Sequence, residues 1–215
     1  MTIPAIRSYP MPTAADLPPN TARWRIDNRR SVLLVHDMQR YFLAPFAERE
    51  APRADLVRNV TSLRDRCVKR GVPVVFTAQP GNMTPQQRGL LKDFWGPGMS
   101  DAPAERALID GLDPAGATVL TKWRYSAFHG SGLLDHIREL NRDQVIICGV
   151  YAHLGCLITA YDAFGHDLQP FVVADAVADF SRSCHDMALA TAAESCAAVA
   201  MTADVIAQIT DPDVA

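Results

Sequence analysis

The segment "SVLLVHD", residues 31–37, is a short apolar run that ends in an acidic residue. It lacks the alternation of apolar and polar residues typical of a half-exposed strand, so it predicts a strand buried on both faces. The next periodic segment, residues 54–71, carries Leu56 and Val60 at helical spacing before Gly71 ends it. A buried strand followed by a helix predicts the first unit of a parallel sheet.

This unit recurs along the chain. Strands that alternate with helices are joined by right-handed crossovers, which place helices on both faces of a mostly parallel sheet. We therefore predict an α/β fold, a three-layer doubly wound sandwich around a mostly parallel six-stranded sheet. The further strands are expected at residues 72–79, 117–122, 143–149, 169–175 and 197–202, each buried on both faces, and helices near 103–111, 131–140, 154–166 and 184–197.

Length and composition indicate one folded unit. The chain has 215 residues, of which 48% are hydrophobic and 21% charged, enough apolar material for one well-filled core. Residues 1–30 hold five prolines, which predicts an irregular arm lying over the domain. We predict a single domain over residues 1–215 that includes this arm.

Charge and cysteine usage exclude several classes of partner. The formal net charge is -3 and basic residues form no long run, so neither nucleic acid nor a membrane surface is an expected partner. No apolar run approaches the roughly 18 residues of a membrane span and no signal peptide is visible, which predicts a cytoplasmic protein. The five cysteines lack C-x-x-C spacing, which favours reduced thiols over disulfides or a zinc site. We expect no metal and no cofactor.

Polar side chains stand where the predicted strands end. Parallel sheets bind ligands beyond the carboxyl ends of their strands, and Asp37 and Lys122 follow two of these strands. An acid beside a fixed cation can act as a general acid or base, or the two can form an ordinary salt bridge. His36 points to the other side of its strand and is expected to be a core histidine. Asp175, at another strand end, is interpreted as a helix cap. Neither G-x-G-x-x-G nor a P-loop follows the first strand, so a nucleotide is not expected.

Six longer stretches follow one another in a set order: "LLVHDMQRYF" (33–42), "FTAQPGNMT" (76–84), "RGLLKDFWGPGM" (88–99), "TKWRYSAF" (121–128), "GVYAHLGC" (149–156) and "VADAVADFS" (173–181). Together they resemble the isochorismatase branch of the isochorismatase-like hydrolases over nearly the whole chain. The resemblance implies a six-stranded parallel sheet with a catalytic aspartate at Asp37 and a catalytic lysine at Lys122. It also implies a homo-oligomer, commonly a dimer, and a cis peptide bond before Tyr151.

The resemblance makes position 155 informative. Amidase members of the superfamily hold a nucleophilic cysteine at this position, whereas this chain has Gly155, and Cys156 comes one residue later. One residue on a helix is a rotation of about 100°, so the Cys156 thiol is expected to face away from the site, as a small buried side chain. Gly155, assigned to the catalytic set, is expected to leave room for a substrate ring and to exclude a thioester intermediate. A cysteine amidohydrolase using Cys156 is the remote alternative.

The isochorismatase branch cleaves a vinyl ether, and the resemblance implies the same activity here. The stretch at 78–99 resembles the phenazine-biosynthesis type, which hydrolyses 2-amino-2-deoxyisochorismate to 2,3-dihydro-3-hydroxyanthranilate and pyruvate. The alternative substrate is isochorismate, which gives 2,3-dihydro-2,3-dihydroxybenzoate and pyruvate. A pocket built around the shared carboxylates and vinyl ether is expected to accept both to some degree. The chain ends without the aryl carrier domain that siderophore isochorismatases often carry, so no carrier function is expected.

The same resemblance assigns roles to the site residues. Asp37 is the general acid that protonates the enolpyruvyl methylene, and burial must raise its pKa against the opposing effect of Lys122. Bound substrate carboxylates are expected to take over the charge of Lys122. Phe180 is expected to belong to the core. Substrate binding is assigned to four side chains: Gln79 and Arg88 to hold carboxylates, Trp95 as an aromatic wall or a loop anchor, and Tyr151 with the Gly155 backbone to offer N–H groups at a helix start.

Overall fold

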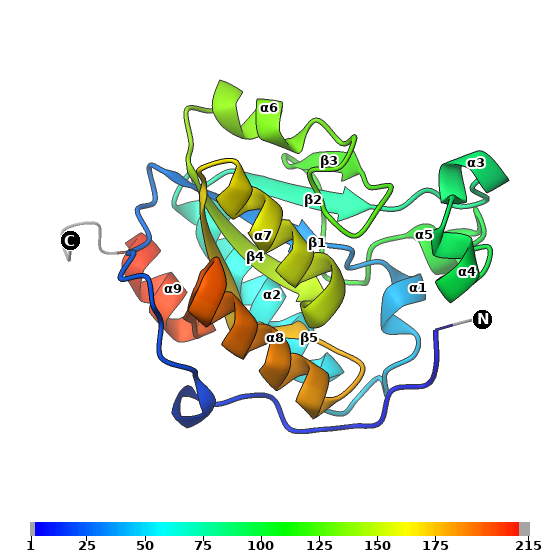
Figure 1. Cartoon of the computed structure of the whole chain (residues 1–215), viewed down its shortest axis with the longest axis horizontal. Coiled ribbons are helices and arrows are strands. Elements are labelled where there is room, and N and C mark those ends of the chain that lie inside the picture. The colour runs from blue at the N-terminus through cyan, green and yellow to red at the C-terminus, as the bar shows by residue number, and fades with distance from the viewer. Residues whose placement is uncertain (1–2, 211–215) are drawn as a thin grey trace.

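The computed structural model describes residues 3–210 and has a six-stranded, all-parallel sheet between two layers of helices (Figure 1). The strand order is β3-β2-β1-β4-β5-β6, and each neighbouring pair is parallel. This confirms the predicted doubly wound α/β fold. The strands are β1 (Ser31–His36), β2 (Val74–Ala78), β3 (Thr118–Thr121), β4 (Gln144–Val150), β5 (Gln169–Ala178) and β6 (Ala198–Ala200).

Alternate side chains of each central strand pack into two separate cores. In β1, Leu33 and Val35 pack with α2 (Arg53–Lys69) and α9 (Thr202–Thr210). Val32 and Leu34 point to the other face, where α6 (Leu133–Glu139), α7 (Leu157–Gly165) and α8 (Arg182–Ser195) cover the sheet (Figure 1). Both faces are therefore buried, which is why these strands show no polar alternation. None of the helices within residues 3–210 is long and apolar enough to cross a membrane.

The proline-rich arm runs over the domain, as expected. Its described part contains one short 3₁₀ turn, η1 (Ala14–Asp16). Two side chains tie it down: the Tyr9 hydroxyl accepts a hydrogen bond from the Asp179 backbone N–H at 2.7 Å, and the Asn20 amide oxygen accepts one from Val199 N–H at 2.7 Å. The segment between β2 and β3 contains three short helices, α3 (Pro85–Arg88), α4 (Leu91–Trp95) and α5 (Pro103–Arg106), and α1 (Arg40–Leu43) follows β1.

The structure differs from the predicted elements in several places. β3 is an edge strand whose residues alternate between partly buried and exposed, so the expectation of burial on both faces is wrong there. The helix expected over residues 103–111 ends at Arg106. A π-helical turn, η2 (Ala152–Cys156), precedes α7, where one α-helix was expected to begin.

β5 extends past the predicted end of the fifth strand. Its register against β4 shifts, so that Ile147 pairs with Val172 but Gly149 pairs with Val177. Asp175 therefore lies within the strand, where its carboxylate accepts hydrogen bonds from Thr202 N–H at 2.7 Å and the Thr202 hydroxyl at 2.8 Å. The predicted capping role of Asp175 agrees with these contacts, but its predicted place at the strand end is wrong.

The strand order places the point of reversal between β1 and β4. Connections leave in opposite directions there, which opens a crevice at the carboxyl ends of these two strands. Gly149 allows the close approach: a Cβ at this position would lie 2.1 Å from the His36 carbonyl oxygen, and its φ is +115°. The residues that follow β1 and β4 are consequently those most exposed to a bound ligand.

Candidate active site

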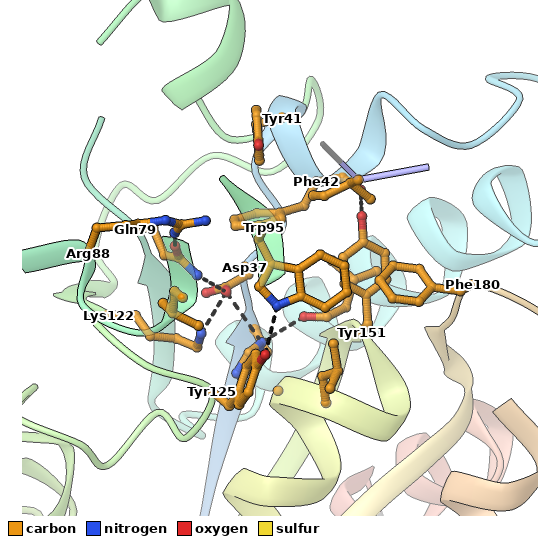
Figure 2. Close-up of a pocket in the computed structure, with 16 residues that line it drawn as sticks. Asp37, Tyr41, Phe42, Gln79, Arg88, Trp95, Lys122, Tyr125, Tyr151 and Phe180 are labelled. Atoms are coloured by element: carbon orange, nitrogen blue, oxygen red, sulfur yellow. Dashed lines mark hydrogen bonds and ion pairs between the residues drawn. The ribbon is translucent and has the colours of Figure 1, made fainter. Parts of the chain in front are cut away.

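A pocket opens at this crevice, beyond the carboxyl ends of β1 to β4 (Figure 2). Charged and polar side chains form one wall and aromatic rings form the other. All seven residues assigned to the site from the sequence line it: Asp37, Gln79, Arg88, Trp95, Lys122, Tyr151 and Gly155.

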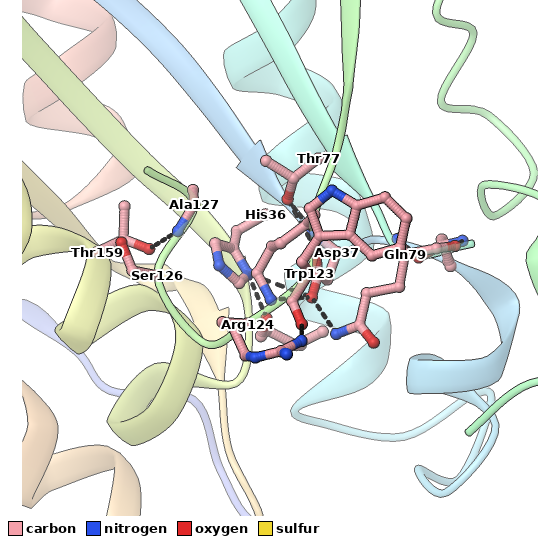
Figure 3. A network of polar contacts seen from close by, with 12 residues as sticks. His36, Asp37, Thr77, Gln79, Trp123, Arg124, Ser126, Ala127 and Thr159 are labelled. Carbon is pink, nitrogen blue, oxygen red and sulfur yellow. Dashed lines mark hydrogen bonds and ion pairs between the residues drawn. The ribbon is translucent and has the colours of Figure 1, made fainter. Parts of the chain in front are cut away.

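Asp37 and Lys122 form a buried ion pair at the centre of the polar wall. The Lys122 ammonium lies 2.9 Å from Oδ2 of Asp37, and the two residues are 2% and 3% exposed. The Thr77 hydroxyl donates to Oδ1 of Asp37 at 2.8 Å, and Gln79 Nε2 lies 3.4 Å from Oδ2 (Figure 3). Asp37 has a φ of +51°, a left-handed conformation that aspartate tolerates better than most residues. The carboxylate is thus held from three sides.

These contacts set the protonation state of Asp37. Burial is the largest effect on its pKa and raises it, but the Lys122 charge and the hydrogen bonds from Lys122 and Thr77 outweigh burial and leave the pKa lowered. The raised pKa expected for a general acid is therefore not a property of the free site. A proton on Asp37 requires that something reduce the effect of Lys122.

Arg88 is a buried cation without an anionic partner in the described part of the chain. It is 6% exposed, its Nε donates to the Gly96 carbonyl at 2.9 Å, and one terminal nitrogen donates to Gln79 Oε1 at 3.3 Å. Burial lowers its pKa. A desolvated guanidinium is costly unless an anion pairs with it, and its planar fork suits a carboxylate. The side chain is arranged to receive an anionic ligand.

Aromatic rings form the opposite wall. The Trp95 ring lies 5.6 Å from that of Phe180, and the Phe180 ring lies 4.4 Å from that of Tyr151 (Figure 2). The Trp95 indole N–H donates to the Tyr125 hydroxyl at 2.7 Å. Trp95 is therefore both a pocket wall and a loop anchor, the two alternatives posed by the sequence. Phe180, expected in the core, also lines the pocket.

Two N–H groups of the turn after β4 already have partners within the protein. The Asp179 carboxylate accepts from His153 N–H at 2.6 Å, and the Tyr151 carbonyl accepts from Leu154 N–H at 3.2 Å. Asp179 thus occupies the position that an anion would take at a helix start. Tyr151 follows a cis peptide bond, as expected, and its hydroxyl donates to the Phe42 carbonyl at 2.7 Å. Its ring faces the pocket (Figure 2).

Gly155 does not leave empty space for a ring. A Cβ on Gly155 would lie 2.1 Å from Cε1 of His36, so the imidazole already fills that volume. The expectation that this glycine makes room for substrate is therefore wrong, because a side chain at position 155 would point at His36 and not into open space. The Gly155 backbone still lines the pocket.

One cluster outside the polar wall has the composition of a metal site. Ligand atoms of His153, Asp179 and Cys184 lie within 4.8 Å of one another. Both carboxylate oxygens of Asp179 already accept hydrogen bonds, from His153 Nδ1 at 2.6 Å and from the backbone of His153 and Phe180 at 2.6 and 2.7 Å. These contacts are those of a capping aspartate and account for the cluster.

Cys156 lies in the core, as its register predicts. It is fully buried among the side chains of α7 and α8, and burial raises the pKa of its thiol well above the usual value. We expect Cys156→Ala to keep its turnover within about threefold of the parent, because the thiol serves only as a small apolar group. Turnover of the parent protein after treatment with iodoacetamide checks the same point without a substitution. A hundredfold loss in a folded Cys156→Ala protein would show that the thiol reacts.

Several pocket residues were not predicted from the sequence. Tyr41 and Phe42 lie on α1, Tyr125 follows Lys122, and Leu91 begins α4. Tyr125 lies within "TKWRYSAF", and Tyr41 and Phe42 lie within "LLVHDMQRYF". Their place in these two motifs was the sequence feature that could have identified them as pocket residues. His36 was expected to be a core histidine, and it is fully buried but also borders the pocket.

Comparison with known proteins agrees with this geometry. A family model described as the isochorismatase domain matches residues 31–204. Phenazine biosynthesis protein PhzD1 of Pseudomonas aeruginosa is 57% identical over 205 residues, 95% of this chain and 98% of that protein. The isochorismatase of Bacillus subtilis is 50% identical over 210 residues, 97% of this chain and 67% of that protein. A solved structure of a cysteine hydrolase from Pseudomonas syringae pv. phaseolicola shares the fold, with a TM-score of 0.81 at 22% identity over 95% of this chain and 99% of that one.

Proposed function

The chain belongs to the isochorismatase family, and from this premise we propose that it hydrolyses the vinyl ether of 2-amino-2-deoxyisochorismate, releasing pyruvate and 2,3-dihydro-3-hydroxyanthranilate. The similarity to PhzD1, a phenazine biosynthesis protein, supports this substrate. Isochorismate is the alternative, supported by the lower identity to the Bacillus subtilis isochorismatase. The two substrates differ by an amine in place of a hydroxyl.

The observation that carries the proposal is the pairing of charges in the pocket. Within the described residues, the charged side chains that line it are Asp37, Lys122 and Arg88. With Asp37 ionised they sum to one positive charge, and with Asp37 protonated they sum to two. A chorismate-derived substrate carries two carboxylates, one on the ring and one on the enolpyruvyl group. The two carboxylates can pair one for one with Lys122 and Arg88 only when Asp37 does not hold Lys122, so their binding favours a proton on Asp37, which is the form a general acid needs.

The proposed reaction proceeds without a covalent intermediate. Asp37 gives its proton to the terminal methylene of the enolpyruvyl ether, which produces an oxocarbenium ion. Water attacks the oxygen-bearing carbon of this ion and gives a hemiketal. The hemiketal hydroxyl passes its proton to the ring oxygen as the bond between the ketal carbon and that oxygen breaks. The products are pyruvate and a ring alcohol, and the proton released from water returns to the Asp37 carboxylate. Arg88 and Gln79 hold carboxylates, and the Trp95, Tyr151 and Phe180 rings exclude water from the face of the substrate ring.

Lys122 controls the proton in this scheme. In the free site it pairs with Asp37 and keeps the Asp37 pKa low. A substrate carboxylate that approaches Lys122 shares its charge, so the pKa of Asp37 rises on binding. Lys122 then also pairs with the carboxylate of the pyruvate that forms. Asp37 therefore becomes a proton donor only when substrate is bound.

The activity is tested by following pyruvate in a coupled lactate dehydrogenase assay with 2-amino-2-deoxyisochorismate, isochorismate and chorismate. We expect pyruvate from the first two, with a larger kcat/KM for the amino compound. The Asp37→Asn protein, purified in the same way, controls for contaminating hydrolases. A preparation that releases pyruvate from none of the three would exclude the proposed function, and a larger kcat/KM for isochorismate would favour the alternative.

We further propose that the protein is a homodimer and works in the cytoplasm. Exposed apolar side chains on adjoining helices support self-association: Tyr161 and Phe164 on α7 and Met187 on α8. The five cysteines are free, which supports a reducing compartment.

A further inference from the structure

His36 and Gly155 are far apart in the sequence but interlock in the fold. His36 is the last residue of β1, and Gly155 lies in the η2 turn after β4. A Cβ on Gly155 would lie 2.1 Å from Cε1, 2.8 Å from Nε2 and 2.9 Å from Nδ1 of His36. Contacts this short to three atoms of one ring mean that the ring edge faces the glycine directly.

Space, not backbone conformation, requires glycine at position 155. Its φ lies outside the left-handed region, so the backbone alone accepts any L-residue. Gly165, at the end of α7, also lies outside that region but has no atom within 4 Å of its would-be Cβ. The two glycines therefore differ only in what a side chain would meet.

The His36 ring is held in place by burial and by a hydrogen bond to the backbone. Its side chain is fully buried, and its Nδ1 lies 2.8 Å from the Val150 carbonyl oxygen, which can only accept, so Nδ1 carries the proton. The same nitrogen lies 3.9 Å from Oδ2 of Asp37. Burial lowers the pKa of His36 to about 4, which keeps the ring neutral at neutral pH. The imidazole at the end of β1 thus contacts both the end of β4 and the η2 turn.

We propose that His36 is a positioning residue: its ring sets the spacing between Asp37 and the η2 turn, and it fills the volume that any side chain at position 155, a thiol included, would need. The positioning of Asp37 by His36 rests on the proposed function. The exclusion of a side chain at position 155 rests on geometry alone. The pair determines the type of reaction, because a nucleophile at position 155 requires that His36 first be replaced.

A double-mutant cycle tests the contact. Gly155→Ala alone is expected to lower the urea midpoint of unfolding by about 1 M, since overpacking a rigid core is destabilising. Asparagine at position 36 keeps an N–H that can donate to Val150 but lacks the ring edge. His36→Asn combined with Gly155→Ala should therefore recover most of the lost midpoint. Gly165→Ala is the matched control and should leave the midpoint and turnover unchanged. Additive effects of the two substitutions would overturn the interlock.

Kinetics test the positioning role. We expect His36→Asn to lower kcat at least tenfold while KM changes less than threefold, because the acid is displaced but the carboxylate contacts remain. A His36→Asn protein with unchanged kcat would overturn this role even where the cycle shows coupling. The urea cycle needs no substrate, so its outcome is separate from the proposed function. If the urea midpoints of the two substitutions are coupled but the parent protein releases no pyruvate, only the proposed function is rejected.

A thiol probe tests the exclusion of a nucleophile. The His36→Asn, Gly155→Cys protein is expected to react with iodoacetamide at position 155: the sulfur–carbon bond forms, iodide leaves, and the thiol proton passes to buffer. Peptide mass spectrometry locates the added group. Gly155→Cys alone is expected either to unfold at lower urea or to leave position 155 unlabelled in the native state. Native Gly155→Cys protein with parent stability and equal labelling would contradict the proposal.

Discussion

The Asp37→Asn protein is expected to release pyruvate about 10³-fold more slowly than the parent at saturating substrate, within the range attributed to a positioned general acid. The amide keeps the shape of the side chain and can still accept from the Thr77 hydroxyl, but it has no acidic proton for the enol carbon. KM should change much less than kcat, because the carboxylate contacts belong to Arg88 and Gln79. Asp110→Asn, which alters an exposed carboxylate paired with Arg40, is the matched control. A folded Asp37→Asn protein with parent turnover would remove Asp37 from the acid role.

The pH dependence of the parent protein tests the same assignment. A general acid is active when protonated, so the rate falls as pH rises through its pKa. In the free protein the Asp37 pKa is lowered, chiefly because Lys122 and the hydrogen bonds outweigh burial. The profile of kcat/KM, which reports the free protein, should therefore fall at lower pH than the profile of kcat, which reports the complex. We expect the two midpoints to differ by at least about one pH unit, a sizeable electrostatic effect of substrate.

Lys122→Met is expected to have the largest effect on stability. Both partners of the ion pair are nearly inaccessible to solvent, so removing the cation leaves a buried carboxylate without compensation. Breaking a buried pair in this way costs about 3–5 kcal/mol. The free energy of unfolding at neutral pH, from urea titration, measures it. Lys69→Met, at an exposed position, is the control and should change stability little.

The pH dependence of this stability loss has a definite sign. In the parent, the lowered pKa of Asp37 contributes stability above the ordinary carboxyl pKa, and this contribution is lost as pH falls through the folded-state pKa. In Lys122→Met, the effect of burial on the Asp37 pKa is no longer offset by the charge and hydrogen bond of Lys122, so we expect the pKa to rise; the folded protein is then penalised at neutral pH and relieved by protonation in acid. The difference between the two proteins should shrink as pH falls toward 4. Asp37→Asn combined with Lys122→Met should be more stable than Lys122→Met alone, and a less stable double variant would contradict the argument.

Most of the fold could be predicted because the relevant signals are local. Apolar runs without alternation mark strands buried on both faces, and helical spacing marks the segments between them. The exceptions occur where the position of a strand relative to its neighbours in the sheet decides its burial or its length. β3 reads as a buried run, yet it lies at the sheet edge. β5 continues past Asp175 because a register shift against β4 inserts extra residues, which no local pattern of β5 records. Asp179 rather than Asp175 consequently ends the strand beside the pocket.

The sequence by itself determined the strand and helix order, and with it the placement of Asp37 and Lys122 at the carboxyl ends of strands that share one sheet edge. Only the tertiary structure decided the electrostatic and steric state of the site: the low pKa of Asp37, the charge of Arg88 that finds no anionic partner within residues 3–210, and the imidazole that fills the space beside Gly155. The physical reason is the separation along the chain of the residues on which each property depends. Backbone pattern depends on residues a few positions apart, whereas desolvation, charge pairing and packing depend on atoms brought together from distant segments.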